Sequence, residues 1–389
     1  MKKICVVTAT RAEYGVLRRI IQNIIADSGL ELALVVSGSH LSKRHGYTVD
    51  EIEQDGFPIA ERIGILERHD TEADICQAMG NAAVRFGEMY GRQKPDMVIV
   101  VGDRYELLPI CSSAMIYGIP IAHISGGEIT EGAMDDVVRH CITKMSYLHF
   151  PACEEYRRRI IQLGEEPERV FNFGDVGVEN VRKMDYLPKA QLERFMGISL
   201  DRPYASVTFH PVTLERDSAR KQTEELVSAL GKYKQLNFIV TMANSDLQGE
   251  EINKIFHEGA EKYENIVCYT SLGVKMYLSL IKYAEFVIGN SSSGIIEVPC
   301  FGIPTINIGD RQKGRLRAKS VIDCEPKSGD IERSIEKALS PSFRKIAQEA
   351  ENPYGEGDTA CSIVKTIKSF LEEGVVSQKK KFYDVEGGM

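Results

Sequence analysis

The chain has 389 residues, of which 43% are hydrophobic. This length and composition fit two globular domains of ordinary size and exclude a disordered or fibrous protein. The chain carries 48 Lys and Arg against 56 Asp and Glu, a net charge of −8, so no overall positive field draws it to nucleic acid or to an anionic membrane. A local basic pocket for a small anion stays open, because net charge does not describe one cleft.

The sequence predicts a cytoplasmic protein with reduced thiols. The apolar run at residues 4–7 is soon interrupted by Arg11 and Glu13, which argues against a signal peptide, and no stretch approaches the ~20 apolar residues of a membrane span. The nine cysteines are scattered and include no C-x-x-C pair. We therefore expect neither disulfides nor a zinc site.

The first half of the chain alternates short apolar runs with segments of helical period, a pattern typical of a parallel sheet covered by helices on both faces. Apolar residues at 16–25 recur at one- and four-residue steps and predict an amphipathic helix. Strands are predicted at residues 4–8, 32–36, 97–101, 119–124 and 147–150. This half is therefore expected to be a doubly wound α/β domain.

The same rhythm restarts after Pro203, with strands predicted at residues 204–209, 238–242, 266–269, 286–288 and 305–308. The connector is expected near 174–200, where glycines and Pro188 interrupt the pattern. We therefore expect Rossmann-like domains over 1–178 and 179–359. A last amphipathic helix is predicted at 360–371, and the polar tail 377–389 is expected to fray. Open parallel sheets bind ligands at the carboxyl ends of their strands, so the chemistry is expected in a cleft between two sets of strand-end loops.

The segment after the first predicted strand is TATRAEYG, residues 8–15. It opens a helix, whose unpaired N–H groups attract an anion, and Arg11 adds a bidentate donor. A solvated turn with a surface Arg–Glu pair is the alternative. The chain has no G-x-G-x-x-G fingerprint and no G-x-x-x-x-G-K-[ST] loop, which argues against a redox dinucleotide fold and a P-loop.

The segment GNSSSGIIE, residues 289–297, also leads from a predicted strand into a predicted helix. Its serine hydroxyls and first-turn amides suit a diphosphate, and Glu297 is placed to accept hydrogen bonds from a vicinal diol such as that of ribose. Plain N-capping by serine is the alternative. At the next strand end, Arg311 and Arg315 are placed to counter phosphate charge.

Carboxylates follow two neighbouring strands of the first domain. Asp103 comes directly after the apolar strand 97–101, and Glu128, Asp135 and Asp136 follow the strand 119–124. Such carboxylates can surround one substrate carbon, as proton removal from one face and return to the other requires. For Asp135 and Asp136, simple complementation of a helix dipole is the alternative.

Histidines occur at two further positions of interest. His210, followed by Pro211, ends the first strand of the second domain and is expected at the same cleft, although a structural hydrogen-bonding role is the alternative. His40 and His45 lie in the basic loop 38–46, with no regular helix between them to arrange metal ligands. We expect this loop to contact an anion.

Five ordered motifs, TRAEYG, GDRYE, HISGGEITEGAMDD followed by RH, HP, and IGNSSSGIIEVPCFGIPTINIGDRQKGR, together resemble the hydrolysing UDP-N-acetylglucosamine 2-epimerases of the sialic-acid pathway and their relatives of the legionaminic-acid pathway. The resemblance covers most of the chain. It implies the GT-B fold, with two Rossmann-like doubly wound parallel-sheet domains facing across a nucleotide-sugar cleft. It also implies that a C-terminal helix, here 360–373, returns to the first domain.

The resemblance implies roles for individual residues. Asp103, Glu128 and Asp135 are the expected catalytic carboxylates, with protonated His210 assisting the leaving diphosphate. Some relatives carry Glu two residues after the histidine of the HI element, where this chain has Ser125, so that role falls to Glu128 or is altered. The residues expected to bind the UDP-sugar are Arg11, Arg104, His210, Asn244, Ser291, Ser292, Glu297 and Arg311.

The implied reaction is anti-elimination of UDP to a glycal, followed by addition of water with inversion at sugar carbon 2. The products are N-acetylmannosamine, a precursor of sialic-acid-type nonulosonates, and UDP. No metal, nicotinamide or other cofactor is expected. The expected partners are the UDP-sugar and further copies of the chain in a dimer or tetramer, with no nucleic acid and no membrane.

Four other functions stay open. The same reaction on UDP-N,N′-diacetylbacillosamine leads to legionaminic acid, and a non-hydrolysing 2-epimerase returns the UDP-sugar intact. A GT-B glycosyltransferase binds the same donor but transfers its sugar to an acceptor. A nucleotide-sugar sensor binds it without chemistry.

Overall fold

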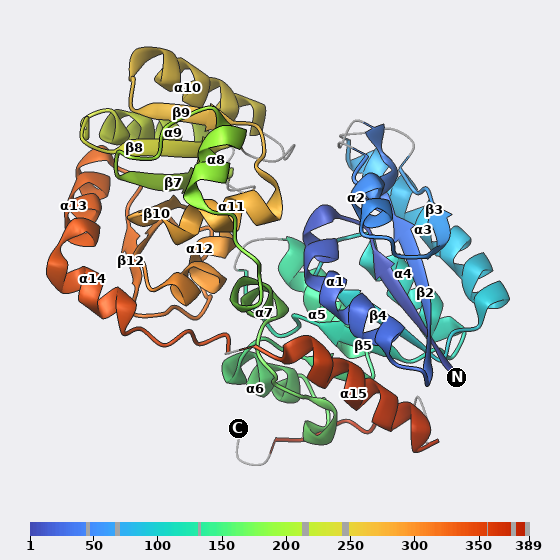
Figure 1. Ribbon diagram of the computed structural model, residues 1–389. Helices are drawn as coiled ribbons and strands as arrows, with labels where there is room; N and C mark the ends of the chain where they lie inside the picture. The colour runs from blue at the N-terminus through green and yellow to red at the C-terminus, as the bar shows by residue number, and fades with distance from the viewer. Residues whose placement is uncertain are drawn as a thin grey trace. The chain divides into compact units, whose positions relative to one another are not determined.

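The chain forms two compact units in a computed structural model that describes residues 1–43, 47–66, 71–130, 134–211, 218–242, 249–355, 357–374 and 379–385. Unit 1 comprises Met1–Glu128, Met134–Asn180 and Tyr354–Met389, and unit 2 comprises Ile129–Ala133 and Val181–Pro353 (Figure 1). The end of the chain therefore belongs to the same unit as its beginning.

Unit 1 is built on a six-stranded sheet with the spatial order β3-β2-β1-β4-β5-β6. All of its strand pairs are parallel. The strands are β1 (Lys2–Thr8), β2 (Leu30–Ser37), β3 (Ile59–Ile63), β4 (Met97–Val101), β5 (Ile121–Ile124) and β6 (Leu148–Phe150). The order of strands reverses between β1 and β4, which makes that pair the topological switch point of the sheet.

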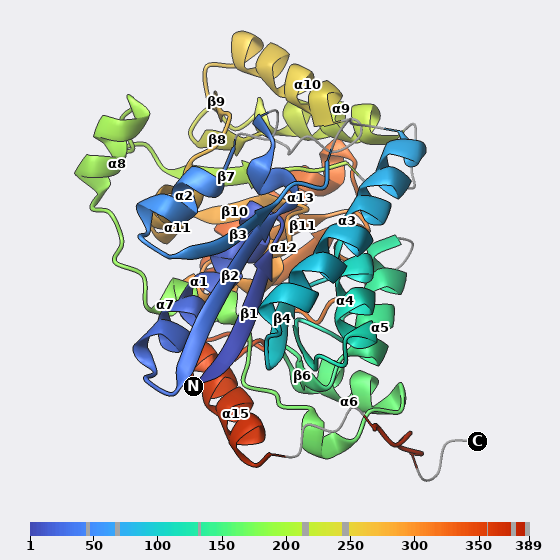
Figure 2. The same cartoon turned by 90° about the vertical axis from the view of Figure 1, so that its right-hand side faces the viewer.

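Side chains that alternate along β1 bury both faces of this sheet. Ile4 and Val6 join one core with helices α1 (Arg11–Ala26) and α15 (Thr359–Glu372). Cys5 and Val7 join the other core, with α3 (Glu72–Gln93), α4 (Leu107–Ile116) and α5 (Met134–Met145). Figure 2 shows these last three helices together on one side of the sheet.

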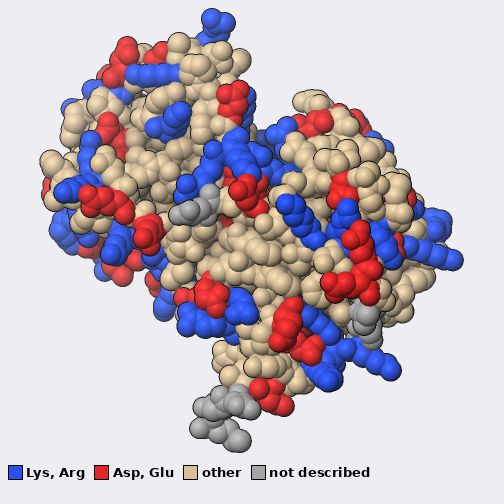
Figure 3. Space-filling view, turned by 60° about the horizontal axis from the view of Figure 1, so that its bottom comes forward, with Lys and Arg blue, Asp and Glu red and all other residues tan. Residues whose placement is uncertain are grey.

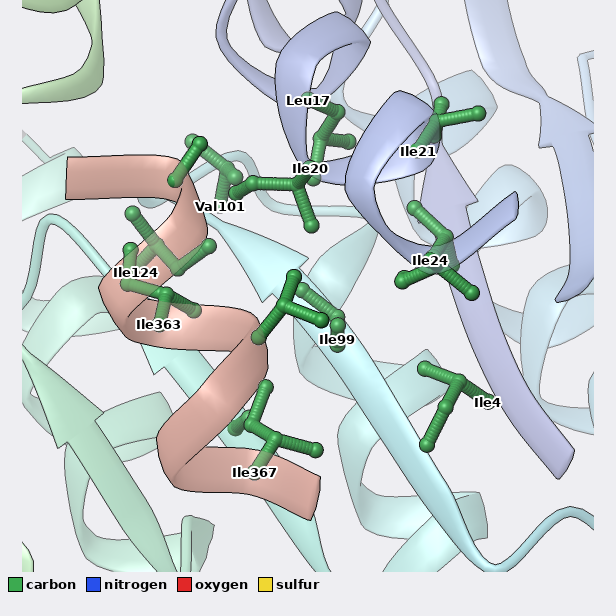
Figure 4. Packing of buried hydrophobic residues seen from close by; sticks show 14 of the residues in the cluster. Ile4, Leu17, Ile20, Ile21, Ile24, Ile99, Val101, Ile124, Ile363 and Ile367 are labelled. Atoms are coloured by element: carbon green, nitrogen blue, oxygen red, sulfur yellow. The ribbon is translucent and has the colours of Figure 1, made fainter. Parts of the chain in front are cut away.

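Helix α15 completes the core of unit 1 although it lies near the end of the chain. Its buried residues include Ile363 and Ile367, which point toward Ile124 and Ile99 of the sheet, beside the buried isoleucines of α1 (Figure 4). Its amphipathic pattern therefore predicts both the helix and its buried face.

Unit 2 repeats the same topology. Its six strands lie in the order β12-β11-β10-β7-β8-β9, so the strand order reverses between β7 and β10. The strands are β7 (Tyr204–Thr208), β8 (Asn237–Thr241), β9 (Ile266–Tyr269), β10 (Phe286–Gly289), β11 (Thr305–Ile308) and β12 (Val321–Cys324).

Helices cover both faces of the second sheet. On one face the core includes α9 (Ser218–Leu230), α10 (Gly249–Lys262), α13 (Ser328–Leu339) and α14 (Pro341–Gln348). On the other face, α8 (Lys189–Met196) and α11 (Gly273–Lys282) pack against Tyr204 and Ile239.

The ten predicted strands are present, with ends that differ by at most two residues. The pattern misses β3 and β12, both at sheet edges. These strands are short and partly exposed, and each includes charged residues, so they lack the apolar run of a buried parallel strand. The expected connector 174–200 also contains the helices α7 (Val176–Arg182) and α8.

Lys380 of the C-terminal tail packs against the rest of unit 1, so the expectation of a frayed tail is wrong at this residue, although its neighbours 381–385 are exposed. The Lys380 ammonium donates to the carbonyls of Lys144 and Ser146 at 2.8 and 2.7 Å and to Glu165 Oε2 at 2.7 Å. Burial raises the pKa of Glu165, but hydrogen bonds with His149, Lys144 and Lys380 outweigh burial and bring that pKa to about 2. Acceptors from distant segments thus hold a lysine that the local sequence places in a polar tail.

Acidic and basic side chains are interspersed over the face in Figure 3, in keeping with a net charge of −8 on 104 charged residues, 48 basic and 56 acidic. Among the residues with described positions, no helix is both long and apolar enough to cross a membrane.

Replacing Ile363 by Ala is expected to lower the free energy of unfolding by about 2–5 kcal/mol, because it opens a cavity between α15 and the sheet. Urea denaturation of the intact chain measures this loss. The matched control is Lys365→Ala on the exposed face of the same helix, expected to stay within about 0.5 kcal/mol of wild type. Equal losses in the two variants would show that α15 does not contribute to the core.

Candidate active site

In each unit, predicted site residues follow the two strands that flank the switch point. Arg11 follows β1 and Asp103 follows β4, whereas His210 follows β7 and Ser291 follows β10. Loops after such strands leave the sheet in opposite directions and create a place for a ligand at its carboxyl edge. The strand order, which the sequence pattern does not reveal, thus gives each unit one candidate binding edge.

A buried arginine joins the acidic segments of unit 1. Arg139 on α5 is only 1% exposed, and its Nη1 donates to the Glu128 carbonyl at 2.9 Å. Its Nη2 donates to the carboxylate of Asp103. Asp136 Oδ1 lies 3.5 Å from Nη1. Because a buried guanidinium needs anionic and carbonyl partners, Arg139 holds the ends of β4 and β5 and the start of α5 together.

Arg139 is absent from the residues predicted to form the site. The motif letters RH include it, and its spacing from Val138 and Ile142 places it on the buried face of α5. A charged residue among buried positions of an amphipathic helix is the signal that points to it.

The two neighbouring aspartates of α5 have different surroundings. Asp136 Oδ2 lies 3.5 Å from His140 Nε2, so Asp136 interacts with its own helix. Asp135 influences Arg104 instead. Burial lowers the pKa of Arg104, but the negative groups around it, Asp135 among them, raise that pKa above its ordinary value. Asp135 therefore acts on Arg104 as well as complementing the dipole of α5.

His123 orients the segment that carries Asp103. It is fully buried, and its Nε2 lies 2.7 Å from the Gly102 carbonyl oxygen, to which it donates. Burial lowers the pKa of His123 to about 4, so the ring is neutral at neutral pH. This histidine of the HI element is therefore a structural link between β5 and the end of β4.

A strained turn brings the chain from β5 to Glu128. Ser125 adopts φ +62°, a left-handed conformation that non-glycine residues rarely take. Gly127 has φ +78°, and a Cβ there would lie 2.5 Å from the Tyr156 carbonyl oxygen. Glu128 follows as a buried residue. Such strain is concentrated at functional sites, which fits a role for this turn in placing Glu128.

Arg11 lies at the first turn of α1 and pairs with a glutamate of α2 (Val49–Gln54). Its Nε is 3.1 Å from Glu51 Oε1, and the two side chains are 36% and 42% exposed. The partner in this surface pair is thus Glu51, whereas Glu13 points inward. An exposed pair contributes at most about 1 kcal/mol, so Arg11 stays a candidate for binding an anion.

His40 is buried, which contradicts for this residue the expectation that the loop 38–46 contacts an anion. It lies in the 3-10 helix η1 (Gly38–Leu41), is 0% exposed, and its ring nitrogens lie 3.0 Å from Thr8 Oγ1 and 2.7 Å from Thr48 Oγ1. Burial lowers the pKa of His40 to about 4, so it carries no charge for an anion. His45 lies outside the described residues.

A glycine closes the switch point of unit 2. Gly289 at the end of β10 has φ +143°, and a Cβ there would lie 1.9 Å from the Thr208 carbonyl oxygen of β7. Asn290 follows, fully buried, and its side chain accepts from the His210 N–H at 2.7 Å and donates to the His210 carbonyl at 2.8 Å. Asn290 therefore fixes the backbone of His210, a role that the motif letters do not reveal.

The loop after β11 meets the same asparagine. The Asn290 carbonyl accepts from Arg311 Nη1 at 3.0 Å and from Gln312 Nε2 at 2.9 Å. Three strand-end segments of unit 2 thus converge on Asn290, and they bring the predicted residues His210 and Arg311 together.

The serine-rich segment forms the short helix α12 (Ser292–Ile296). Its N-cap residue Ser291 makes no side-chain capping hydrogen bond, so plain capping does not explain that serine. Ser293 donates to Glu297 Oε2 at 2.5 Å, and the Tyr277 hydroxyl donates to Ser293 Oγ at 3.3 Å. Glu297 is therefore held by a chain of hydroxyls. The predicted residue Ser292 begins α12, and Asn244 lies outside the described residues.

No three His, Cys, Asp or Glu side chains in the described segments lie together as a metal site. All nine cysteines are free thiols.

Replacing Arg139 by Met is expected to lower the free energy of unfolding by about 3 kcal/mol, because it removes the buried cation that Asp103 and the Glu128 carbonyl contact. Asp103→Asn should lower the free energy of unfolding less in the Arg139→Met protein than in wild type. The double-mutant cycle should give a coupling energy of at least ~1 kcal/mol. Chemical denaturation of the four proteins measures the cycle. Additive losses would show that the two side chains do not interact.

Comparison with known proteins identifies close relatives of this chain. The sequence model of the UDP-N-acetylglucosamine 2-epimerase family matches residues 22–368. A GDP/UDP-N,N'-diacetylbacillosamine 2-epimerase (hydrolyzing) from Campylobacter jejuni is 42% identical, covering 88% of this chain and 89% of its own length. The polysialic acid biosynthesis protein P7 from Escherichia coli is 39% identical, over 99% of this chain and 98% of its own length.

Solved structures share the fold. The crystal structure of UDP-GlcNAc 2-epimerase from Neisseria meningitidis bound to UDP-GlcNAc superposes with a TM-score of 0.82, covering 94% of this chain and 100% of the other at 16% identity. Together with the two parallel sheets, this likeness confirms the predicted α/β fold of GT-B type. The chain belongs to the hydrolysing UDP-N-acetylglucosamine 2-epimerase family.

Proposed function

We propose that the protein converts UDP-N-acetylglucosamine to N-acetylmannosamine and UDP, for the biosynthesis of sialic-acid-type nonulosonates. Family membership makes it a 2-epimerase that acts on a UDP-sugar. The observation that carries the proposal is the convergence of Asp103, Glu128 and the start of α5 on Arg139 at the carboxyl edge of the first sheet. These segments carry carboxylates of the kind that epimerisation at carbon 2 needs, which supports the proposal.

The two units divide the work in this proposal. Residues of unit 2 hold the nucleotide: Ser291, Ser292 and Arg311 bind the diphosphate, and Glu297 accepts from the ribose hydroxyls. The hydrogen bond from Ser293 orients the carboxylate of Glu297. This supports its role, because a fixed carboxylate can accept two hydrogen bonds from a diol. His210, whose backbone Asn290 fixes, donates to the diphosphate, and Asn244 belongs to the same set.

Residues of unit 1 act on the sugar. A carboxylate, Asp103 or Asp135, removes the proton at carbon 2, and the electron pair of that C–H bond forms the double bond to carbon 1. The bond from carbon 1 to the diphosphate oxygen breaks, and UDP leaves with its electron pair. Arg11 and Arg104 stabilise the negative charge that develops on the diphosphate. The product of this step is a glycal.

Water then adds across the double bond. Its hydroxyl group joins carbon 1 and its proton passes to a carboxylate. A different, protonated carboxyl group delivers a proton to carbon 2 from the face opposite to the first base, which inverts that centre. Glu128 is the third carboxyl of this set. We further propose that the enzyme acts as a homo-oligomer.

A second substrate has a specific observation in its favour. The Campylobacter jejuni relative, which is 42% identical, is named for N,N'-diacetylbacillosamine, and so is a Legionella pneumophila relative that is 30% identical. The same elimination and hydration on UDP-N,N'-diacetylbacillosamine is therefore the alternative function. The chemistry at carbons 1 and 2 is identical, and only the contacts to carbons 4 and 6 distinguish the two sugars.

Asp103→Asn and Asp135→Asn are each expected to lower turnover by at least ~100-fold and to leave UDP affinity largely unchanged, because loss of an acid or base acts on the transition state. The double variant Ser291→Ala/Glu297→Gln should mainly weaken UDP binding. Steady-state UDP release and calorimetry with UDP measure the two effects. The reverse pattern would contradict the proposed division between the units.

Incubation of the enzyme with each UDP-sugar in heavy water tests the reaction and the substrate. We expect UDP and a free 2-epimerised sugar with one deuterium at carbon 2, and a higher kcat/KM for UDP-N-acetylglucosamine. A higher value for UDP-N,N'-diacetylbacillosamine would favour the alternative substrate. Sugar that stays attached to UDP would indicate a non-hydrolysing epimerase, transfer to an acceptor without label would indicate a glycosyltransferase, and absence of any product would favour a sensor.

A further inference from the structure

Two buried glutamates lie beside Arg104 at the switch point of unit 1. Glu13 is on α1 after β1, and Glu106 precedes α4 after β4. They are 6% and 2% exposed. The proposed mechanism uses neither carboxyl group, although β1 and β4 are neighbours and Arg104 is assigned to the diphosphate. Burying a carboxylate this deeply costs free energy unless a partner compensates its charge. We therefore expect the two glutamates to have a role.

Helix capping explains only one of the four carboxyl oxygens. Glu13 Oε2 accepts from the N–H groups of Ala9 at 2.6 Å and Thr10 at 3.2 Å, as part of a capping box with Thr10. Glu13 Oε1 and Glu106 Oε2 are buried and have no hydrogen-bond partner among the residues whose positions are described. Glu106 Oε1 lies 3.5 Å from Arg104 Nε.

The capping box of α3 provides a comparison within the same unit. Thr71 and Asp74 form the same reciprocal hydrogen bonds at the start of that helix, but there the bonds are exposed. Capping therefore does not require a buried carboxyl group, and it does not require a second one next to it.

The guanidinium of Arg104 faces more negative groups than it can balance, because Asp135 acts on it as well as Glu13 and Glu106. Two ionised carboxylates in a low-dielectric site repel each other, and the single guanidinium of Arg104 compensates one of them. Burial first, and then the charge of Glu106, raise the pKa of Glu13 to about 8, against the backbone N–H groups and Arg104. From η1, His40 packs nearby against Tyr14 of the same helix, but its pKa of about 4 leaves it neutral here.

We propose that Glu13 and Glu106 are positioning residues that hold Arg104 in a charge-balanced triad while Glu13 keeps a proton, so that the cation is fully effective toward the substrate diphosphate only while that proton is bound. The diphosphate part of this inference rests on the proposed function. When the proton leaves, the triad gains a net negative charge at the edge where an anion is to bind, and affinity for that anion falls.

Calorimetry with UDP between pH 7 and 9 tests the triad. As the pH rises from 7 to 9, the UDP affinity of wild type should fall roughly fivefold more than that of Glu13→Gln. The glutamine carries a permanently neutral group of the same shape. Glu106→Gln should also show little of this loss, because one carboxylate then remains to balance Arg104. The matched control is Asp74→Asn, which alters the capping box of α3 and should retain the wild-type pH profile. A Glu13→Gln profile that coincides with wild type would overturn the proposal.

Thermal unfolding without ligand tests the proton on Glu13 independently of the function. The folded chain keeps a proton on Glu13 that the unfolded chain loses above its ordinary pKa of 4.5, so wild type loses stability as pH rises from about 4.5 to about 8. The Tm of Glu13→Gln minus that of wild type should therefore increase over this range and then level off. A constant difference would exclude a proton retained on Glu13. If wild type binds no UDP but the difference in Tm increases, the proposed function fails while the retained proton on Glu13 is supported.

Discussion

In an open parallel sheet, the loops of two adjacent strands diverge only where the strand order reverses, and this constraint places Arg11 and Asp103 at one edge of unit 1 and His210 and Ser291 at one edge of unit 2. The reversal falls between β1 and β4 in unit 1 and between β7 and β10 in unit 2. At all other positions, the crossover helices cover the sheet and fill the space above neighbouring strands. Functional side chains must therefore lie on the four segments that follow these strands, or on loops that reach the same edge.

The edge of unit 1 is dominated by buried charge. Arg139 binds Asp103 and the Glu128 carbonyl from below, and Arg104 lies among Glu13, Glu106 and the charge of Asp135. The buried guanidinium of Arg139 costs free energy to remove from water and is stable only with its partners in place. The site is thus sensitive to the protonation of residues that never touch the sugar, which suits an elimination in which charge develops on the leaving group.

The edge of unit 2 uses backbone and amide groups instead. Gly289 permits a close approach of β10 to β7, and Asn290 then exchanges two hydrogen bonds with the backbone of His210 and accepts two from the loop of Arg311 and Gln312. Neutral groups of this kind keep their geometry over a wide pH range. A scaffold of this kind suits nucleotide binding, whereas proton transfer needs the titratable groups of unit 1.

The sequence by itself determined the local structure and the residues that end each buried strand. Apolar runs specify the ten inner strands, the 3.6-residue period specifies α1 and α15, and motif order specifies the family, because these signals depend on neighbouring residues. Asp103, Glu128 and Ser291 could be named for that reason. The residues that lie next to them in space could not be named, because the sequence does not reveal the order of the strands in the sheet.

Only the tertiary structure decided which distant groups meet. Arg139 reaches Asp103 across 36 positions, His40 is buried between Thr8 and Thr48, and Lys380 contacts Glu165 across 215 positions. His40 in its loop and Lys380 in the polar tail gave no local sign of burial, whereas Arg139 was marked only by its place on the buried face of α5. The edge strands β3 and β12 lack an apolar run. The physical reason is the same in each case: burial of a polar group is stable only when partners from elsewhere in the chain satisfy it, and the fold alone supplies those partners.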